Sequence, residues 1–203
     1  KRALHISLPM GLQQTIMCSA YVMTTIIIAP LGTFAIAANS FGVIVESLCY
    51  MPGYGIADAA TTLVGQSIGA GRHELMKRFA WLSVGLGVTV MAVMGVVMYV
   101  GAPVAMAMMT PAEEVRRLGV EVLRIEAFAE PMFAAAIVSY GVFVGAAKTL
   151  VPSIMNLVSI WGVRISLAAL LAPSMGMRGV WIATCIELDY RGFIFLVKLK
   201  FGN

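Results

Sequence analysis

Long apolar runs occupy most of this sequence and limit what the chain can fold into. A helix needs about 20 mostly apolar residues to cross the hydrocarbon core of a bilayer. Only 12% of the residues are charged, against about 25% in a typical soluble domain. The sequence therefore predicts an all-α integral membrane protein, a bundle of six transmembrane helices with no room for a soluble domain. The expected spans are Leu8–Ala29, Thr33–Ile68, Phe79–Ala102, Gly119–Ala147, Pro152–Leu171 and Gly179–Leu199, with a short amphipathic stretch, Ala112–Leu118, before the fourth.

Basic residues are distributed unevenly between the two ends of these spans. Cytoplasmic segments of membrane proteins carry an excess of Lys and Arg. With the N-terminus in the cytoplasm, eight basic residues fall on the cytoplasmic side and three, Arg116, Arg117 and Arg178, on the other. This predicts cytoplasmic N- and C-termini in the plasma membrane, with Gly69–Arg78 as the strongest cytoplasmic loop. The eight are Lys1, Arg2, Arg72, Lys77, Arg78, Lys148, Lys198 and Lys200.

The sequence lacks the motifs of membrane enzymes. Its two histidines, His5 and His73, lie near span ends, and it contains no HExxH or GxxxxGK[ST] pattern. The three cysteines stand in three different apolar runs without metal-ligand spacing. We therefore expect no enzyme activity, no catalytic residues, no metal site and no organic cofactor. The net charge of +4 arises from few charges between apolar runs, so no nucleic-acid partner is expected.

Two prolines interrupt the expected spans. The second span is too long for one straight helix and contains Pro52 within the sequence MPGYG, and the fourth span contains Pro131. Because proline removes a backbone donor and clashes with the preceding turn, a kink is expected at each. Interrupted spans are common where a transporter binds its cargo, although membrane helices also tolerate proline and glycine without such a role.

Two acids of the second span, Glu46 and Asp58, lie on either side of the expected kink. A charge inside a membrane is costly and usually faces a cavity or a partner. Both residues are therefore candidates for the cargo cleft or for cation coupling.

Two further acids, Glu126 and Glu130, are four residues apart in the fourth span, which predicts that they share one helix face. Neighbouring carboxylates in an apolar helix repel each other, so such a pair can take up and release protons, as a proton-coupled transporter requires. The alternative is that they pair with Arg124, Arg164 or a base of another span.

Arg164 lies near the middle of the fifth span, and the sixth span holds Glu187, Asp189 and Arg191. Glu187 and Arg191 have the i,i+4 spacing of an internal ion pair. We interpret these four residues as buried ion pairs that satisfy packing. The pair Gly141 and Gly145 has the GxxxG spacing that permits close helix approach.

Several motifs together resemble one family. The sequence reads LPMGLQQ from Leu8, LGTFAIAA between the first two spans, and TLVGQSIGAGR at the exit of the second span, up to Arg72. With the Glu130-Pro131 pair and GAAKTLVP from Gly145, these stretches strongly resemble the multidrug and toxic compound extrusion (MATE) transporters. The resemblance covers nearly the whole chain and points to that family's C-terminal lobe.

The resemblance implies a fold of twelve helices in two six-helix lobes around a central cleft. Residues 1–203 would form one lobe, and a homologous N-terminal lobe outside this chain would be its partner. The implied activity is antiport, in which a cation moves inward while a drug-like cargo moves outward.

The chain departs from the family's pattern at three places. Some members carry an acid in the first helix of this lobe, where this chain has Met17, and others carry one in the fourth span, where it has Phe133. The loop Val144–Thr149 lacks the family's usual Arg and Asp. The usual cation site of this lobe is therefore not reproduced, and Glu46, Glu126 and Glu130 are the expected substitutes, unless the coupling acid lies in the other lobe.

The resulting prediction is part of a secondary active antiporter that exports drug-like or organic cationic compounds in exchange for protons or sodium. One alternative is a related flippase for lipid-linked saccharides, which would need a cationic cleft built on Arg164 and Arg191. Another is a six-helix membrane fragment that transports nothing. The bilayer and a small-molecule cargo are the expected partners.

Overall fold

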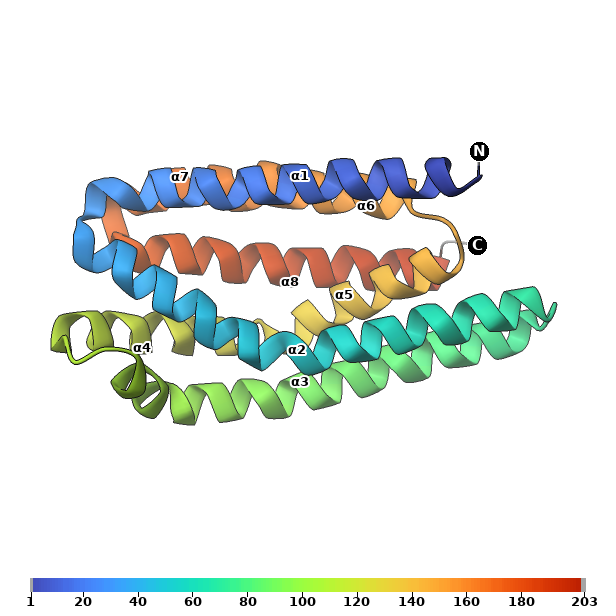
Figure 1. The fold of residues 1–203 in the computed structure, drawn as a ribbon, viewed down its shortest axis with the longest axis horizontal. Coiled ribbons are helices and arrows are strands. Elements are labelled where there is room, and N and C mark those ends of the chain that lie inside the picture. Colours follow the sequence, from blue (N-terminus) through green and yellow to red (C-terminus); the bar gives the residue numbers. More distant parts are fainter. Residues whose placement is uncertain (1, 202–203) are drawn as a thin grey trace.

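The computed structural model describes residues 2–201, and the long elements among them are all helices (Figure 1). Side chains are described for residues 7, 8 and 10–201. Lys1 and the side chains of Arg2 and His5 therefore lie outside the described part. The elements are α1 (Arg2–Ile28), the 3-10 turn η1 (Ala29–Leu31), α2 (Thr33–Gly69), α3 (His73–Met109), α4 (Glu113–Ala127), α5 (Glu130–Gly145), α6 (Leu150–Val158), the π-helix η2 (Ser159–Ile165), α7 (Ser166–Met175) and α8 (Met177–Phe201).

These elements form the predicted six-helix bundle. α4 and α5 form one bent rod. α6, η2 and α7 follow one another directly and form a second rod. Four helical segments are long and apolar enough to cross a membrane, and the bent pair α4–α5 would be a fifth. α8 does not meet this criterion because charged residues recur along it, from Arg178 to Lys200. It runs through the middle of the bundle between α1 and α2 (Figure 1), where protein rather than lipid surrounds much of it.

The two prolines have different effects. α2 continues through Pro52 as one helix, and Figure 1 shows it changing direction near its middle. At Pro131 the rod breaks: α4 ends at Ala127, α5 begins at Glu130, and the two are bent by 58°. Proline has no backbone N–H to donate to the preceding turn, so the helical hydrogen-bond pattern is interrupted here. The fourth span is therefore two helices rather than one.

Several expected boundaries were wrong. Most of the expected loop Gly69–Arg78 is helical, because α3 already begins at His73. The amphipathic stretch Ala112–Leu118 is not separate from the fourth span, since α4 runs without a break from Glu113 to Ala127. In both places polar residues extend a helix beyond the apolar core, which hydropathy alone does not detect.

The expected close approach at Gly141 and Gly145 is confirmed. A methyl group on Gly141 would lie 2.5 Å from the Ala57 carbonyl oxygen, and the Thr61 hydroxyl donates a 2.9 Å hydrogen bond to the Gly141 carbonyl. α5 therefore packs against α2 with almost no side chain between them. This contact places the cleft-facing sides of α2 and α5 next to each other.

Candidate functional site

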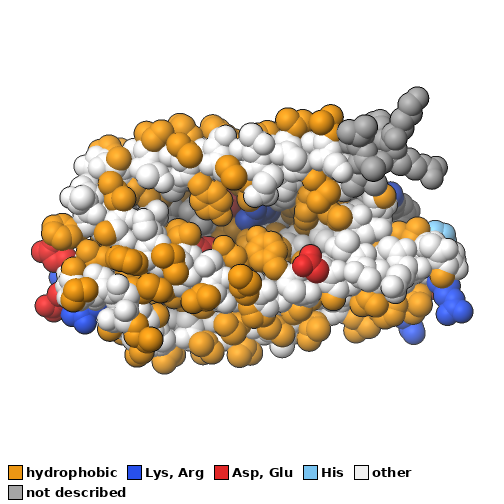
Figure 2. Space-filling model, in the orientation of Figure 1, with side chains coloured by type: hydrophobic (Ala, Val, Ile, Leu, Met, Phe, Trp, Pro, Cys, Tyr) orange, Lys and Arg blue, Asp and Glu red, His pale blue; other side chains and the backbone are white. Residues whose placement is uncertain are grey.

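A cleft opens on one face of the bundle, and Figure 2 shows the molecule hollowed at the centre of this face. The cavity has a volume of about 550 Å³. Its lining comes from α1, α2, α5, α6, η2 and α8, so segments far apart in the sequence build one site. This volume lies within the range of small-molecule sites.

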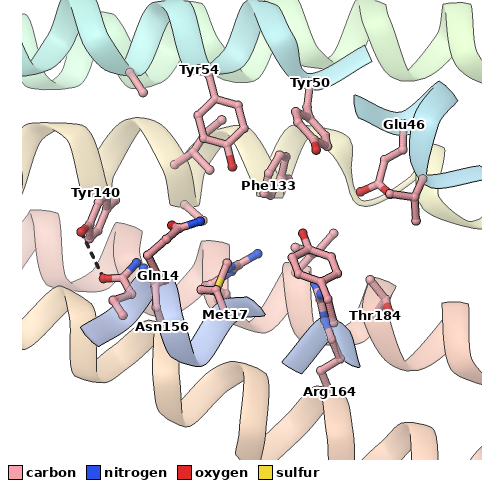
Figure 3. Close-up of a pocket in the computed structure, with 18 of the residues that line it drawn as sticks. Gln14, Met17, Glu46, Tyr50, Tyr54, Phe133, Tyr140, Asn156, Arg164 and Thr184 are labelled. Atoms are coloured by element: carbon pink, nitrogen blue, oxygen red, sulfur yellow. Dashed lines mark hydrogen bonds between the residues drawn. The ribbon is translucent and has the colours of Figure 1, made fainter. Parts of the chain in front are cut away.

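Aromatic rings form one wall of the cleft. Tyr50 and Tyr54 of α2 pack edge-to-face with each other at 5.4 Å between ring centroids. Phe133 of α5 packs against both, at 5.6 Å and 6.2 Å (Figure 3). The Arg191 guanidinium carbon lies 5.7 Å from the Phe133 centroid. Phe133, where the resemblance leads us to expect an acid in some family members, gives this wall an aromatic surface.

Of the four acids predicted for the site, two line the cleft. Glu46 is half-buried and Asp58 is exposed, and both line the cavity. Figure 3 shows Glu46 beside Tyr50, on the wall opposite Arg164. Neither acid forms an ion pair with another residue of the described part. Both are therefore available to a bound cation.

The other two predicted acids are buried behind the cleft rather than in its lining. Glu126 is 1% exposed and Glu130 is 2% exposed. They do not share a helix face as expected, because Glu126 belongs to α4 and Glu130 begins α5 beyond the bend. α3 packs closely here, since a methyl group on Gly95 would lie 3.3 Å from Glu130 Cβ.

Neither of these buried carboxyl groups is neutralised by a base. Both Glu126 oxygens and Glu130 Oε2 lack a hydrogen-bond partner among the described residues. The alternative pairing with Arg124 does not occur, because that side chain is exposed and its guanidinium lies 5.1 Å from the Tyr99 ring centroid. An isolated buried carboxylate is costly, and no base in the described part of the chain offsets that cost here.

Arg164, Glu187 and Arg191 form an ionic triad around the buried Glu187 carboxylate. Arg164 donates a 2.8 Å hydrogen bond to Glu187 Oε2, and Arg191 Nε lies 3.2 Å from Glu187 Oε1. The Ser159 hydroxyl donates to the same carboxylate at 2.6 Å. Asp189, which was expected in this group, is exposed and takes no part in it. It is two positions further along α8 than Glu187, so it projects from another side of the helix.

Polar side chains that sequence reasoning did not single out also face the cleft. The Tyr140 hydroxyl donates to Gln13 Oε1 at 3.1 Å, and Trp181 Nε1 donates to Asn39 Oδ1 at 3.2 Å. Asn156 is 7% exposed and lines the cavity, yet its amide makes no side-chain hydrogen bond to a described residue. The presence of amide side chains inside apolar spans could have identified some of these residues from the sequence, because burying an amide is costly unless it is hydrogen-bonded.

The charges around the cleft are mostly acidic. The cavity lining itself holds two acids and two bases, and three further acids are buried nearby, so the described residues around the cleft include five acids against two bases. Both bases share Glu187, so their positive charge is partly cancelled. The acids are Glu46, Asp58, Glu126, Glu130 and Glu187, and the bases are Arg164 and Arg191.

Comparison with known proteins identifies the family. The MatE family model matches residues 9–170. This chain belongs to the MatE family. Similar curated proteins include the probable multidrug resistance protein NorM of Brucella suis, 30% identical over 203 residues, and that of Xylella fastidiosa, 29% identical over 187 residues. The alignments cover 97% and 91% of the MatE chain, and 43% and 40% of the two relatives.

Solved structures show the same fold. A MOP superfamily transporter of Pyrococcus furiosus superposes with a TM-score of 0.92 at 17% identity, covering 98% of this chain and 44% of that one. The Vibrio cholerae MATE transporter VcmN gives 0.91 at 18%, covering 97% and 45%. The MatE chain thus spans less than half the length of its relatives, which is consistent with one lobe of a multi-pass membrane transporter.

Proposed function

We propose that this chain is one lobe of a secondary active antiporter that exports drug-like organic cations across the plasma membrane in exchange for protons or sodium. The observation that carries the proposal is the charge balance of the cleft. Glu46 and Asp58 face the cavity without an ion-pair partner in the described part, beside the rings of Tyr50, Tyr54 and Phe133. Carboxylates and aromatic faces both attract cations.

The buried acids suit a coupling role in this proposal. Glu126 and Glu130 flank the α4–α5 bend and lack a base partner. A proton or a sodium ion would neutralise them, and its release would leave a buried charge that favours another conformation of the bend. Binding of the coupling ion would in this way alter how α5, which carries Phe133, faces the cleft.

The cleft is open on one side, as expected for one half of a binding site. The relatives are more than twice as long as this chain, so we propose that a second six-helix lobe closes the cleft and completes the cargo site. In the proposed orientation, Arg72 in the α2–α3 connection and Lys77 and Arg78 at the start of α3 face the cytoplasm.

The alternative of a flippase for lipid-linked saccharides is less well supported. A pyrophosphate would need free positive charge in the cleft, but Arg164 and Arg191 both contact Glu187. Glu46 and Asp58 would in addition repel such an anion.

The test is exchange by the full-length protein in proteoliposomes. With a pH gradient or a sodium gradient imposed in separate samples, addition of tetraphenylphosphonium should dissipate one of the two. Glu126→Gln and Glu130→Gln should each lower that exchange at least about tenfold, which corresponds to loss of one charged contact. Glu114→Gln is the matched control, because Glu114 is an exposed acid in the first turn of α4.

Three outcomes would contradict the proposal. If neither gradient responds to the cation, the protein is not a cation antiporter of this kind. If it responds but both glutamine variants exchange like the Glu114→Gln control, coupling resides elsewhere. Translocation of a lipid-linked saccharide without either gradient would favour the flippase.

A further inference from the structure

The cleft side of α2 carries a regular stripe of four residues. Glu46, Tyr50, Tyr54 and Asp58 follow one another at intervals of four, and all four line the cavity. Residues four apart lie on the same side of a helix. The stripe therefore has a carboxylate at each end and two phenol rings between them.

The stripe is long compared with a compact cation. Twelve residues of α-helix rise about 18 Å, so one small charged group cannot contact both Glu46 and Asp58. The change of direction at Pro52 does not interrupt the stripe, because Tyr50 and Tyr54 on either side of it remain in ring contact at 5.4 Å. Phe133 of α5 touches both rings and makes the middle of the stripe a continuous aromatic surface.

The wall facing the stripe offers a polar side chain that no described residue engages through a side-chain hydrogen bond. Asn156 of α6 is more than nine-tenths buried, lines the cavity and makes no side-chain hydrogen bond to a described residue. In Figure 3 it lies with Tyr140 and Gln14 toward the Tyr54 end of the site, away from Glu46. The Tyr140 hydroxyl is already bonded to Gln13. The unused amide oxygen can accept a hydrogen bond from an N–H donor on a bound molecule.

We propose that the cleft selects elongated aromatic dications, in which two N–H-bearing cationic groups are joined by an apolar, ring-containing middle. This inference rests on the proposed function, because it names the cargo class of the same cleft. One cationic end pairs with Glu46. The other pairs with Asp58 and donates to the Asn156 amide. The middle lies against Tyr50, Tyr54 and Phe133.

Charge neutralisation is the reason for this preference. A compact monocation pairs with one carboxylate and leaves the other without a partner. A dication of matching length pairs with both carboxylates. Its second contact forms within a complex that already exists, so little further translational and rotational entropy is lost. Affinity should therefore depend on the separation of the two charges and not only on their number.

The experiment measures binding to the full-length protein in nanodiscs. The probes are benzamidine and a series of bis-benzamidines with linkers of increasing length. Affinity should rise to a maximum at one linker length and fall on either side. Glu46→Gln and Asp58→Asn should each lower affinity for the best dication about tenfold. The double variant should bind it no better than it binds benzamidine.

Glu74→Gln is the control, because Glu74 is an exposed acid in the first turn of α3, outside the cavity. Affinity that does not vary with linker length would overturn the inference, since it would indicate two independent binding sites for single cationic groups. Equal losses of benzamidine and dication binding in both acid variants would do the same, because a monocation pairs with only one of the two carboxylates. Gradient exchange driven by a monocation tests the antiporter proposal separately. Gradient exchange together with affinity that does not depend on linker length would thus refute the cargo class alone. Absence of both gradient exchange and linker dependence would refute the antiporter proposal and the cargo class.

Discussion

Arg164 of η2 and Glu187 of α8 form a 2.8 Å ion pair whose carboxylate is fully buried. The same carboxylate lies 3.2 Å from Arg191 Nε and accepts a hydrogen bond from Ser159. The first residue of the π-helix, Ser159, and its next-to-last residue, Arg164, are thereby attached to one point on α8. Such segments are frequent at functional sites, and here the segment presents Arg164 to the cleft while Glu187 cancels part of its charge.

Glu187→Gln should destabilise the lobe strongly. The substitution keeps the shape of the side chain but leaves the charges of Arg164 and Arg191 without compensation inside the bundle. Removing one partner of a buried ion pair typically costs about 3–5 kcal/mol. The measurement is the free energy of unfolding in detergent, together with the thermal midpoint.

Asp189→Asn is the matched control for that experiment. Asp189 is two residues further along α8, exposed, and in no ion pair of the described part, so its replacement should change the stability by less than about 0.5 kcal/mol. Similar losses in the two variants would show that the triad has no special role in stability.

Gly141→Ala should weaken the contact between α2 and α5. The added methyl group would lie 2.5 Å from the Ala57 carbonyl oxygen, so the helices must separate. Overpacking of this kind costs about 1–3 kcal/mol, and unfolding in detergent measures it.

Gly85→Ala provides the opposite expectation on α3. A methyl group there meets no atom within 4 Å, and alanine favours a helix over glycine by about 1 kcal/mol. This variant should be as stable as the wild type or more stable. A loss comparable to that of Gly141→Ala would refute the close-contact explanation.

Phe133→Ala should reduce affinity for aromatic cations more than for aliphatic ones. The ring contacts Tyr50 and Tyr54 and lies near the Arg191 guanidinium, so its loss opens the aromatic wall. Ring contacts contribute about 0.5–1.5 kcal/mol each, which predicts a loss of up to about tenfold for an aromatic cation. Binding of benzamidine and tetramethylammonium to the full-length protein compares the two classes, and equal losses for both would contradict a specific aromatic role.

The sequence allowed some of these relationships to be predicted and concealed others. The Glu187–Arg191 contact follows from i,i+4 spacing on one helix, and hydropathy with family motifs predicted the six-helix lobe. The Arg164–Glu187 contact depends on how two rods pack and on a π-helical turn, for which the sequence contains no periodic signal. The exposure of Asp189 could have been predicted, because residues two apart in a helix do not share a face.

The acids of the fourth span show a different limit of sequence reasoning. Pro131 correctly predicted an interruption, but the expectation that Glu126 and Glu130 share one face assumed an unbroken helix. The 58° bend between α4 and α5 removes that relationship. Whether either acid faces the cleft depends on this bend, and in the structure both acids are buried behind the cleft.

Surface labelling should place the two ends of α3 on opposite sides of the membrane. α3 has 37 residues, about 55 Å of helix, which exceeds a hydrocarbon core of about 30 Å. Glu74 in its first turn and Pro111 just beyond its end are both exposed. We expect Glu74→Cys to lie in the cytoplasm beside Lys77 and Arg78, and Pro111→Cys to lie outside. With Cys18, Cys49 and Cys185 replaced by serine, an impermeant maleimide added to intact cells should label only Pro111→Cys, and permeabilisation should expose Glu74→Cys. Labelling of Glu74→Cys alone in intact cells would reverse the orientation, and with it the direction in which the cleft loads its cargo.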